Sequence, residues 1–114
     1  MVADRLPADE SEEVDTKVVK DVPSNMGYYD IGDGTIAAFR KLVLDEKGKS
    51  KIGTAIVNGT AGVYEYEQFR KGTRALFEIL RDATRTGATT VFGGADTGAA
   101  VELLGFKADD FSLV

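Results

Sequence analysis

Two short apolar runs, TAIV at residues 54–57 and TTVF at residues 89–92, most strongly constrain what this chain can fold into. Each run is too short for a helix, and each is followed by a glycine-containing turn and then by apolar residues at helical spacing. Strands that alternate with helices in this way form parallel sheets with helices packed on them. The sequence therefore predicts an α/β fold with a parallel sheet and flanking helices.

Three segments have the apolar spacing of helices. The first begins near Thr35 and is expected to end at Gly48, and the second is expected to be capped at Gly87 and the third at Gly105. The second is the longest, and its apolar positions recur at steps of four and three residues. The residues predicted to face the core are Ile36, Phe39 and Val43 in the first helix, Phe69, Thr73, Leu76, Leu80 and Ala83 in the second, and Ala100, Val101 and Leu104 in the third.

The two ends of the chain give weaker signals. Residues 1–16 are rich in Asp and Glu and are expected to form a solvated excursion. Residues 16–22 contain several β-branched side chains and predict a short strand that ends at Pro23. Residues 111–114 predict a strand that has just begun. Together the elements predict an incomplete, Rossmann-like three-layer sandwich, in which ligands bind at the carboxyl ends of the strands.

The composition excludes several kinds of chemistry. The 114 residues suit one domain and include neither Cys nor His, which removes zinc fingers, thiol nucleophiles and imidazole catalysis. The net charge of −5 opposes binding to nucleic acid, and no apolar run approaches the roughly 20 residues that span a bilayer. The first six residues lack the apolar region of a secretory signal. We therefore expect a cytoplasmic protein without nucleic-acid or membrane partners.

The loop GGADTG at residues 93–98 is the most informative candidate site. Glycines after a strand let the backbone approach a ligand, and the helix that follows directs free N–H groups toward an anion. Asp96 beside such an anion would need a cation between the two negative charges, and Mg²⁺ is the usual one. The alternative is that Asp96 or Thr97 only caps the helix. The pattern is no Walker loop, because no GK[ST] sequence follows.

The loop NGTAGVYE at residues 58–65 is the second candidate. A carboxylate such as Glu65, just beyond a buried strand, can accept hydrogen bonds from ribose hydroxyls. It can equally be an acid in the first turn of a helix, favoured by the helix dipole. Tyr28 and Tyr29 could stack on a base or lie on the surface. The residue pattern leaves these alternatives open.

Three motifs together resemble one family. The run IVNGTAGVYEYEQFRKGTRAL is similar to the phosphoglycerate kinase segment V-W-N-G-P-x-G-V-F-E-x-x-x-F-x-x-G-T. VFGGADTGAAVE resembles the I-I-G-G-G-D-T/S-A-A-A segment of that family, and MGYYDIGDGTI resembles M-G-L-D-I-G-P-x-S/T. The motifs follow one another in the family's order and at nearly its spacing. The resemblance covers essentially the whole chain and well under half of the enzyme.

The resemblance implies a role for seven residues around a nucleotide. Gly27 would approach the adenine, Glu65 would bind the ribose and Asn58 would lie near the phosphate chain. Residues 94–97 would form the phosphate loop, in which Asp96 would be the Mg²⁺-side carboxylate. The seven residues are Gly27, Asn58, Glu65, Gly94, Ala95, Asp96 and Thr97.

The sequence departs from the family pattern at several positions. Thr60 stands in place of a proline, and Ala95 replaces the third glycine of the phosphate loop. Tyr28 replaces an apolar residue near the base, and Tyr29 is an extra residue before Asp30. These changes bear on how well the chain would hold a nucleotide.

The resemblance further implies that residues 1–114 are part of the C-terminal, nucleotide-binding domain of a phosphoglycerate kinase. Its ligands would be MgADP and MgATP, and its partner would be the phosphoglycerate-binding domain that these residues do not include. The parent enzyme would convert 1,3-bisphosphoglycerate and ADP to 3-phosphoglycerate and ATP, while this chain alone, with no catalytic residue of its own, would be inactive. The alternatives are a stand-alone, non-catalytic α/β module that binds a nucleotide or a protein, and a fragment with no function of its own.

Overall fold

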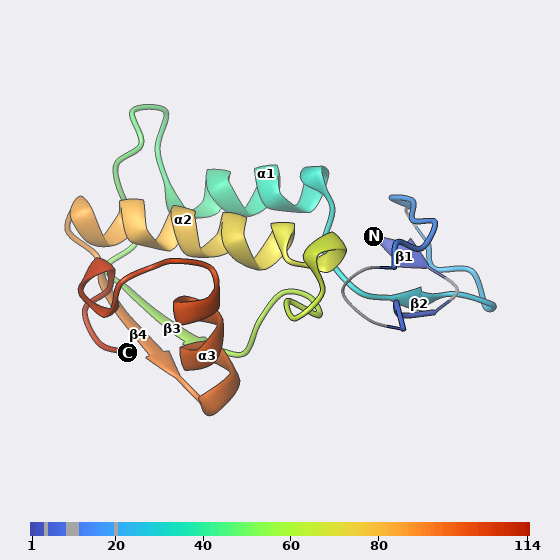
Figure 1. Ribbon diagram of the computed structural model, residues 1–114. Helices are drawn as coiled ribbons and strands as arrows, with labels where there is room; N and C mark the ends of the chain where they lie inside the picture. The colour runs from blue at the N-terminus through green and yellow to red at the C-terminus, as the bar shows by residue number, and fades with distance from the viewer. Residues whose placement is uncertain (4, 9–11, 20) are drawn as a thin grey trace.

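The computed structural model describes residues 1–3, 5–8, 12–19 and 21–114. Its elements, in chain order, are β1 (Val2–Ala3), β2 (Gly27–Tyr28), α1 (Asp33–Val43), β3 (Thr54–Asn58), the 3-10 turn η1 (Glu67–Phe69), α2 (Lys71–Arg85), β4 (Thr89–Gly93), α3 (Ala95–Leu103) and the 3-10 turn η2 (Ala108–Asp110) (Figure 1). None of the helices among these residues is long and apolar enough to cross a membrane.

Strands β3 and β4 form the predicted parallel sheet. Their register pairs Thr54 with Thr89, Ile56 with Val91 and Asn58 with Gly93. Leu113 adds a single parallel bridge to Val91 on the other side of β4. The strand predicted over residues 111–114 is therefore present only as this bridge, and the sheet is incomplete, as the sequence predicts.

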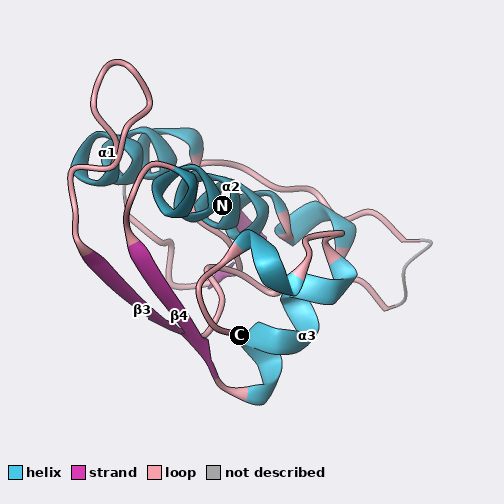
Figure 2. Cartoon of the chain, turned by 90° about the vertical axis from the view of Figure 1, so that its left-hand side faces the viewer, coloured by secondary structure: helices cyan, strands magenta, loops and turns pink. Residues whose placement is uncertain are grey.

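The helices cover one face of this sheet. Ala55 and Val57 of β3 and Phe92 of β4 turn inward and pack against α2 and α3. Ile56, which points the other way, is 79% exposed, and Leu113 is 62% exposed. The described residues thus supply the sheet and one helical layer of the predicted sandwich, and both strands lie to one side of the helices (Figure 2).

The core is centred on α2, and its buried face differs in part from the predicted stripe. Thr73, Leu80 and Ala83 are buried as predicted, whereas Leu76 is half-buried and Phe77 and Ile79 are buried instead. Phe69 is buried too, but it lies in η1, because the helix begins only at Lys71. Phe77 belongs to an aromatic cluster, and its ring centroid lies 5.0 Å, 5.8 Å and 6.2 Å from those of Phe92, Phe106 and Phe111 respectively.

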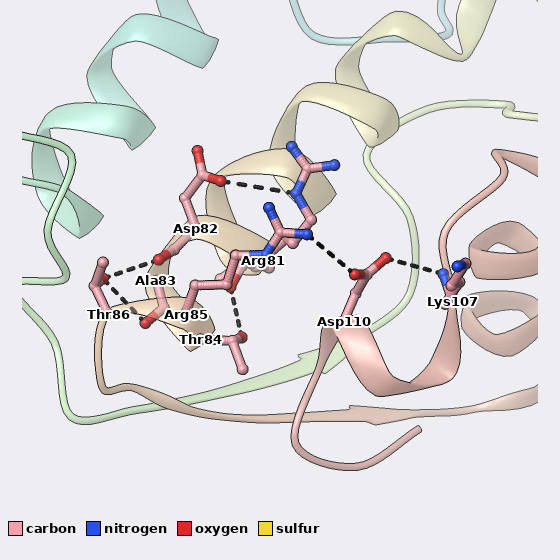
Figure 3. A network of polar contacts seen from close by, with 9 residues as sticks. Arg81, Asp82, Ala83, Thr84, Arg85, Thr86, Lys107 and Asp110 are labelled. Atoms are coloured by element: carbon pink, nitrogen blue, oxygen red, sulfur yellow. Dashed lines mark hydrogen bonds and ion pairs between the residues drawn. The ribbon is translucent and has the colours of Figure 1, made fainter.

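Two of the three predicted glycine caps are confirmed. At the end of α2, Gly87 has a φ of +117°, and the amides of Gly87 and Ala88 donate to the carbonyls of Thr84 and Ala83. This pair of hydrogen bonds is a Schellman motif, which satisfies the last carbonyls of a helix. Gly105 closes α3 in the same way. Arg85, the last residue of α2, forms an ion pair with Asp110 of η2 (Figure 3).

Two other predictions are wrong. Helix α1 ends at Val43 rather than at Gly48, because the chain turns back there and Leu44 pairs with Ser50 in an antiparallel bridge. The strand predicted over residues 16–22 is a single bridge between Lys17 and Val2. The side chains of Val18 and Val22 are exposed, so the β-branched run has no core to bury against. Residue 20 and the acidic residues 4 and 9–10 of the predicted excursion lie outside the described residues.

A buried carboxylate joins the N-terminal segment to α2. Asp30 is 0% exposed, and its two oxygens accept hydrogen bonds from the amides of Ile31, at 2.8 Å, and Gly72, at 3.0 Å. Gly72 lies in the first turn of α2, so Asp30 satisfies one of the free amides of that helix from a distant part of the chain. Burial raises the pKa of Asp30, while the two amides, the chain N-terminus and Lys71 act in the opposite direction.

This raised pKa predicts a pH dependence of stability. A carboxyl group whose pKa is higher in the folded protein than in the unfolded chain binds its proton more tightly when folded. Its contribution is therefore complete below the ordinary value of 3.8 and is lost as the pH rises through the folded value. Urea unfolding at a series of pH values should show native stability falling from about pH 4 upward, relative to the Asp30→Asn variant. A difference between the two proteins that stays constant with pH would contradict this prediction.

Candidate functional site

The two predicted loops meet at the carboxyl ends of β3 and β4. The register places Asn58 beside Gly93, and the amide of Gly59 donates to the Thr97 hydroxyl at 2.7 Å. The Asn58 side-chain oxygen lies 3.0 Å from the position that a Cβ on Gly94 would occupy. The structure thus brings together Asn58, Gly94 and Thr97, three of the residues that the sequence singles out.

The first turn of α3 has no side-chain cap. Its N-cap is Gly94, with a φ of +91° and a ψ of 147°, and no side chain there bonds to the helix amides. This overturns the alternative in which Asp96 or Thr97 is the cap. Thr97 is 0% exposed and accepts the Gly59 amide, whereas Ala95 and Asp96 are exposed. The first turn therefore presents backbone N–H groups and one carboxylate at the molecular surface.

Two carboxylates near these loops affect the pKa of the buried Tyr64 side chain. Burial raises the pKa of Tyr64, and the negative charges of Glu65 and Asp96 raise it further. Glu65 is exposed and lies in a loop that precedes η1 and α2, so it is not an acid of a first helical turn. Arg70 holds this loop by donating to the carbonyls of Tyr64 and Glu65. Arg70 is also the N-cap residue of α2.

Gly27 lies in a different part of the molecule. It belongs to β2, and a side chain at this position would collide with the ring of Tyr29. That ring packs on Phe69 with 5.3 Å between centroids, so Tyr29 faces the core and is not free to stack on a base. Tyr28 is 52% exposed. One backbone hydrogen bond, from the Val63 amide to the Tyr29 carbonyl, links this segment to the loop at residues 58–65.

The acid groups of the site fit a cation that brings ligands of its own. Among the described residues, no three Asp or Glu side chains lie close enough together to hold a metal ion. Asp96 supplies one exposed carboxylate beside the bare first turn of α3. Mg²⁺ commonly binds one or two carboxylates together with phosphate oxygens and water. The donor set here suits a magnesium ion that arrives with a phosphate-bearing ligand.

An apolar hollow of about 400 Å³ opens beside the start of the loop at residues 58–65. It is bounded by Phe39 of α1, by Leu76 of α2 and by residues 55–61, which include the free side of β3. The sequence gives no sign of this hollow, because its walls come from three separate segments.

Comparison with known proteins identifies the family. The model of the phosphoglycerate kinase family matches residues 1–114. The chain belongs to the phosphoglycerate kinase family. The phosphoglycerate kinase of Chlorobaculum tepidum is 39% identical over 107 residues, which are 94% of this chain and 25% of that protein. The phosphoglycerate kinase of Mycolicibacterium smegmatis is 37% identical over 112 residues, which are 98% of this chain and 26% of that protein.

A solved structure gives the same result. The phosphoglycerate kinase of Coxiella burnetii superposes with a TM-score of 0.77 at 35% identity, covering 97% of this chain and 26% of that one. The parallel sheet with flanking helices is thus the fold of part of a phosphoglycerate kinase. The chain spans about a quarter of the length of the curated relatives it matches.

The backbone at Gly94 gives a prediction for this candidate site. Alanine at position 94 would meet Asn58 and would have to adopt a φ of +91°, a region that costs residues other than glycine about 1–3 kcal/mol. Gly94→Ala should lower the free energy of unfolding by that amount in urea titrations. The matched control is Gly93→Ala, since a Cβ there meets nothing within 4 Å. Equal stability of the two variants would contradict the prediction.

Proposed function

We propose that residues 1–114 are part of the C-terminal, nucleotide-binding domain of a phosphoglycerate kinase and hold MgADP or MgATP. The observation that carries the proposal is the uncapped first turn of α3, which presents free amides beside the exposed Asp96 carboxylate. Such a turn attracts a phosphate group, and the carboxylate beside it favours the magnesium-bound form of that group. Membership of the family supports the same ligand.

Each site residue has a role in this proposal. The amides of Ala95, Asp96 and Thr97 would bind phosphate oxygens, with Gly94 allowing close approach. Asn58 would donate its side-chain amide to the phosphate chain, and Asp96 would hold Mg²⁺, directly or through water. Glu65 would accept hydrogen bonds from the ribose. Gly27, which lies beside the ring of Tyr29, would approach the base.

The reaction of the parent enzyme would be the reversible transfer of a phosphoryl group from 1,3-bisphosphoglycerate to MgADP, giving 3-phosphoglycerate and MgATP. Bound magnesium supplies positive charge that offsets the charge of the phosphates. This chain would bind and orient the nucleotide. A partner domain that binds the phosphoglycerate would hold the second reactant and supply further cationic groups.

Nucleotide binding is the direct test. Isothermal titration should show weak binding of MgADP, with a dissociation constant in the millimolar range, because only part of the pocket is present. Asp96→Asn should weaken binding of MgADP and leave that of ADP without magnesium unchanged or stronger. Asp109→Asn is the matched control, since it removes the same charge from an exposed residue in η2. Equal binding of MgADP by native protein and Asp96→Asn would exclude the magnesium role.

The isolated 114-residue chain should show no phosphoglycerate kinase turnover. In-line transfer needs both reactants held together, and their orientation can supply roughly 7–11 kcal/mol of the barrier. The assay couples 3-phosphoglycerate and MgATP to NADH oxidation by glyceraldehyde-3-phosphate dehydrogenase. Turnover that appears only after the missing part of a family member is added would support the proposal. Turnover by the chain alone that disappears in Asp96→Ala would refute the prediction.

A non-catalytic module that binds a nucleotide or a protein is the second candidate. The observation in its favour is that the described residues bury three apolar clusters of their own. The complementation assay separates the two candidates, because a stand-alone module would gain no turnover from an added domain.

A further inference from the structure

Two buried hydroxyl groups hold the loop between β3 and η1. The amide of Gly59 donates to Thr97 Oγ1 at 2.7 Å, and the amide of Ala61 donates to Thr73 Oγ1 at 3.1 Å. Both threonines are 0% exposed. Alternate amides of the loop are therefore directed into the protein and end on side-chain oxygens.

The two hydroxyls belong to different helices. Thr73 lies in the first turn of α2, and Thr97 lies in the first turn of α3. The loop is thus tied to the N-terminal ends of both helices at once. Its remaining bonds are local or lead elsewhere, since the Thr60 hydroxyl donates to the Gly62 carbonyl and the Val63 amide donates to the Tyr29 carbonyl.

Apart from these two side-chain acceptors, the loop is held by the Thr60–Gly62 and Val63–Tyr29 bonds and, near η1, by Arg70. Residues 59–63 belong to no helix or strand, so side-chain acceptors replace a regular hydrogen-bond ladder. The Ala61 amide is partly buried, and an amide that loses its acceptor in such a place keeps part of its desolvation penalty, which favours another backbone conformation. Removal of the Thr73 hydroxyl would release Ala61 while the Thr97 bond still held Gly59.

We propose that Thr73 is a positioning residue for the nucleotide site. Its hydroxyl fixes Ala61, and together with the Gly59–Thr97 bond it sets the path of the loop that follows Asn58. Thr73 touches no ligand itself. This inference rests on the proposed function, because it assigns to the loop at residues 58–62 one wall of the phosphate-binding region.

Three variants isolate the hydroxyl group. Thr73→Val replaces the hydroxyl by a methyl group of similar size, and Thr73→Ser keeps the hydroxyl. Thr84→Val is the matched control on the same helix, where the hydroxyl donates to Leu80 and lies 2.7 Å from Thr90 Oγ1, at the end remote from the site. Figure 3 shows Thr84 among the polar contacts of that end. Thr84→Val also removes hydrogen bonds from α2 but leaves the loop untouched.

The first measurement is titration of the full 114-residue chain with MgADP. Thr73→Val should weaken binding about tenfold, which corresponds to roughly 1.4 kcal/mol, while Thr73→Ser and Thr84→Val bind as the native protein does. Native-like affinity in Thr73→Val, or an equal loss in Thr84→Val, would overturn the proposal. Should the valine variant fail to fold, Thr73→Ser and Thr73→Ala replace it, because they differ only in the hydroxyl, and equal affinities would again overturn it.

The second measurement is hydrogen exchange at the Ala61 amide by NMR without nucleotide. Exchange at Ala61 should be about tenfold faster in Thr73→Val than in native protein and unchanged in Thr84→Val. The exchange measurement distinguishes the positioning role of Thr73 from the proposed nucleotide function. Native protein that fails to bind MgADP, together with faster exchange at Ala61, would refute the nucleotide function and support the positioning of the loop. Unchanged exchange at Ala61 in Thr73→Val would refute the positioning role whatever the nucleotide affinity.

Discussion

The parallel pairing of β3 with β4 is the constraint on which the rest of the structure depends. Parallel strands end at the same edge of a sheet, so the register that sets Asn58 beside Gly93 also sets their two loops side by side. The bond from Gly59 to Thr97 joins those loops only because of this register. A shift of β3 by one residue would turn Ala55 and Val57 away from the helices, the same shift of β4 would turn Phe92 away, and either shift would move the loops apart.

The sequence predicts the centre of the fold well because local pattern and tertiary packing agree there. The runs at residues 54–57 and 89–92 are strands, and Gly87 and Gly105 close their helices through left-handed backbone. Prediction fails where the decisive contact is distant. The run at residues 16–22 has β-forming side chains, but among its described residues only Lys17 forms a strand bridge. Strands β1 and β2 are two residues long and pair although most of the N-terminal segment separates them in sequence. Phe77 is buried because three aromatic rings from later segments surround it.

In the candidate site, too, the features set by local sequence are predicted and those set by distant contacts are not. Asp96 and its glycines stand out in the sequence, but the sequence leaves open whether Asp96 caps the helix, and the uncapped first turn at Gly94 excludes that alternative. The roles of Thr73 and Thr97 as acceptors for loop amides depend on partners 12 and 38 residues away, which no local pattern reveals. Tyr29 likewise lies in a sequence typical of an exposed loop, yet it is half-buried and its ring packs against Phe69 of the core. How the seven site residues act on a nucleotide is still a prediction.

Charge explains why the site would need a cation as well as free amides. The chain carries a net charge of −5, and the negative charges of Glu65 and Asp96 both raise the pKa of Tyr64, although Arg70 also lies at this loop. The amides of one helical turn offer partial positive charge equivalent to about half a unit, which cannot by itself offset several phosphate charges beside two carboxylates. An ion held between Asp96 and the phosphates would reverse the local balance. The same Asp96 carboxylate that repels a free nucleotide would then favour its magnesium complex, and the selectivity of the site would arise from that single change of sign.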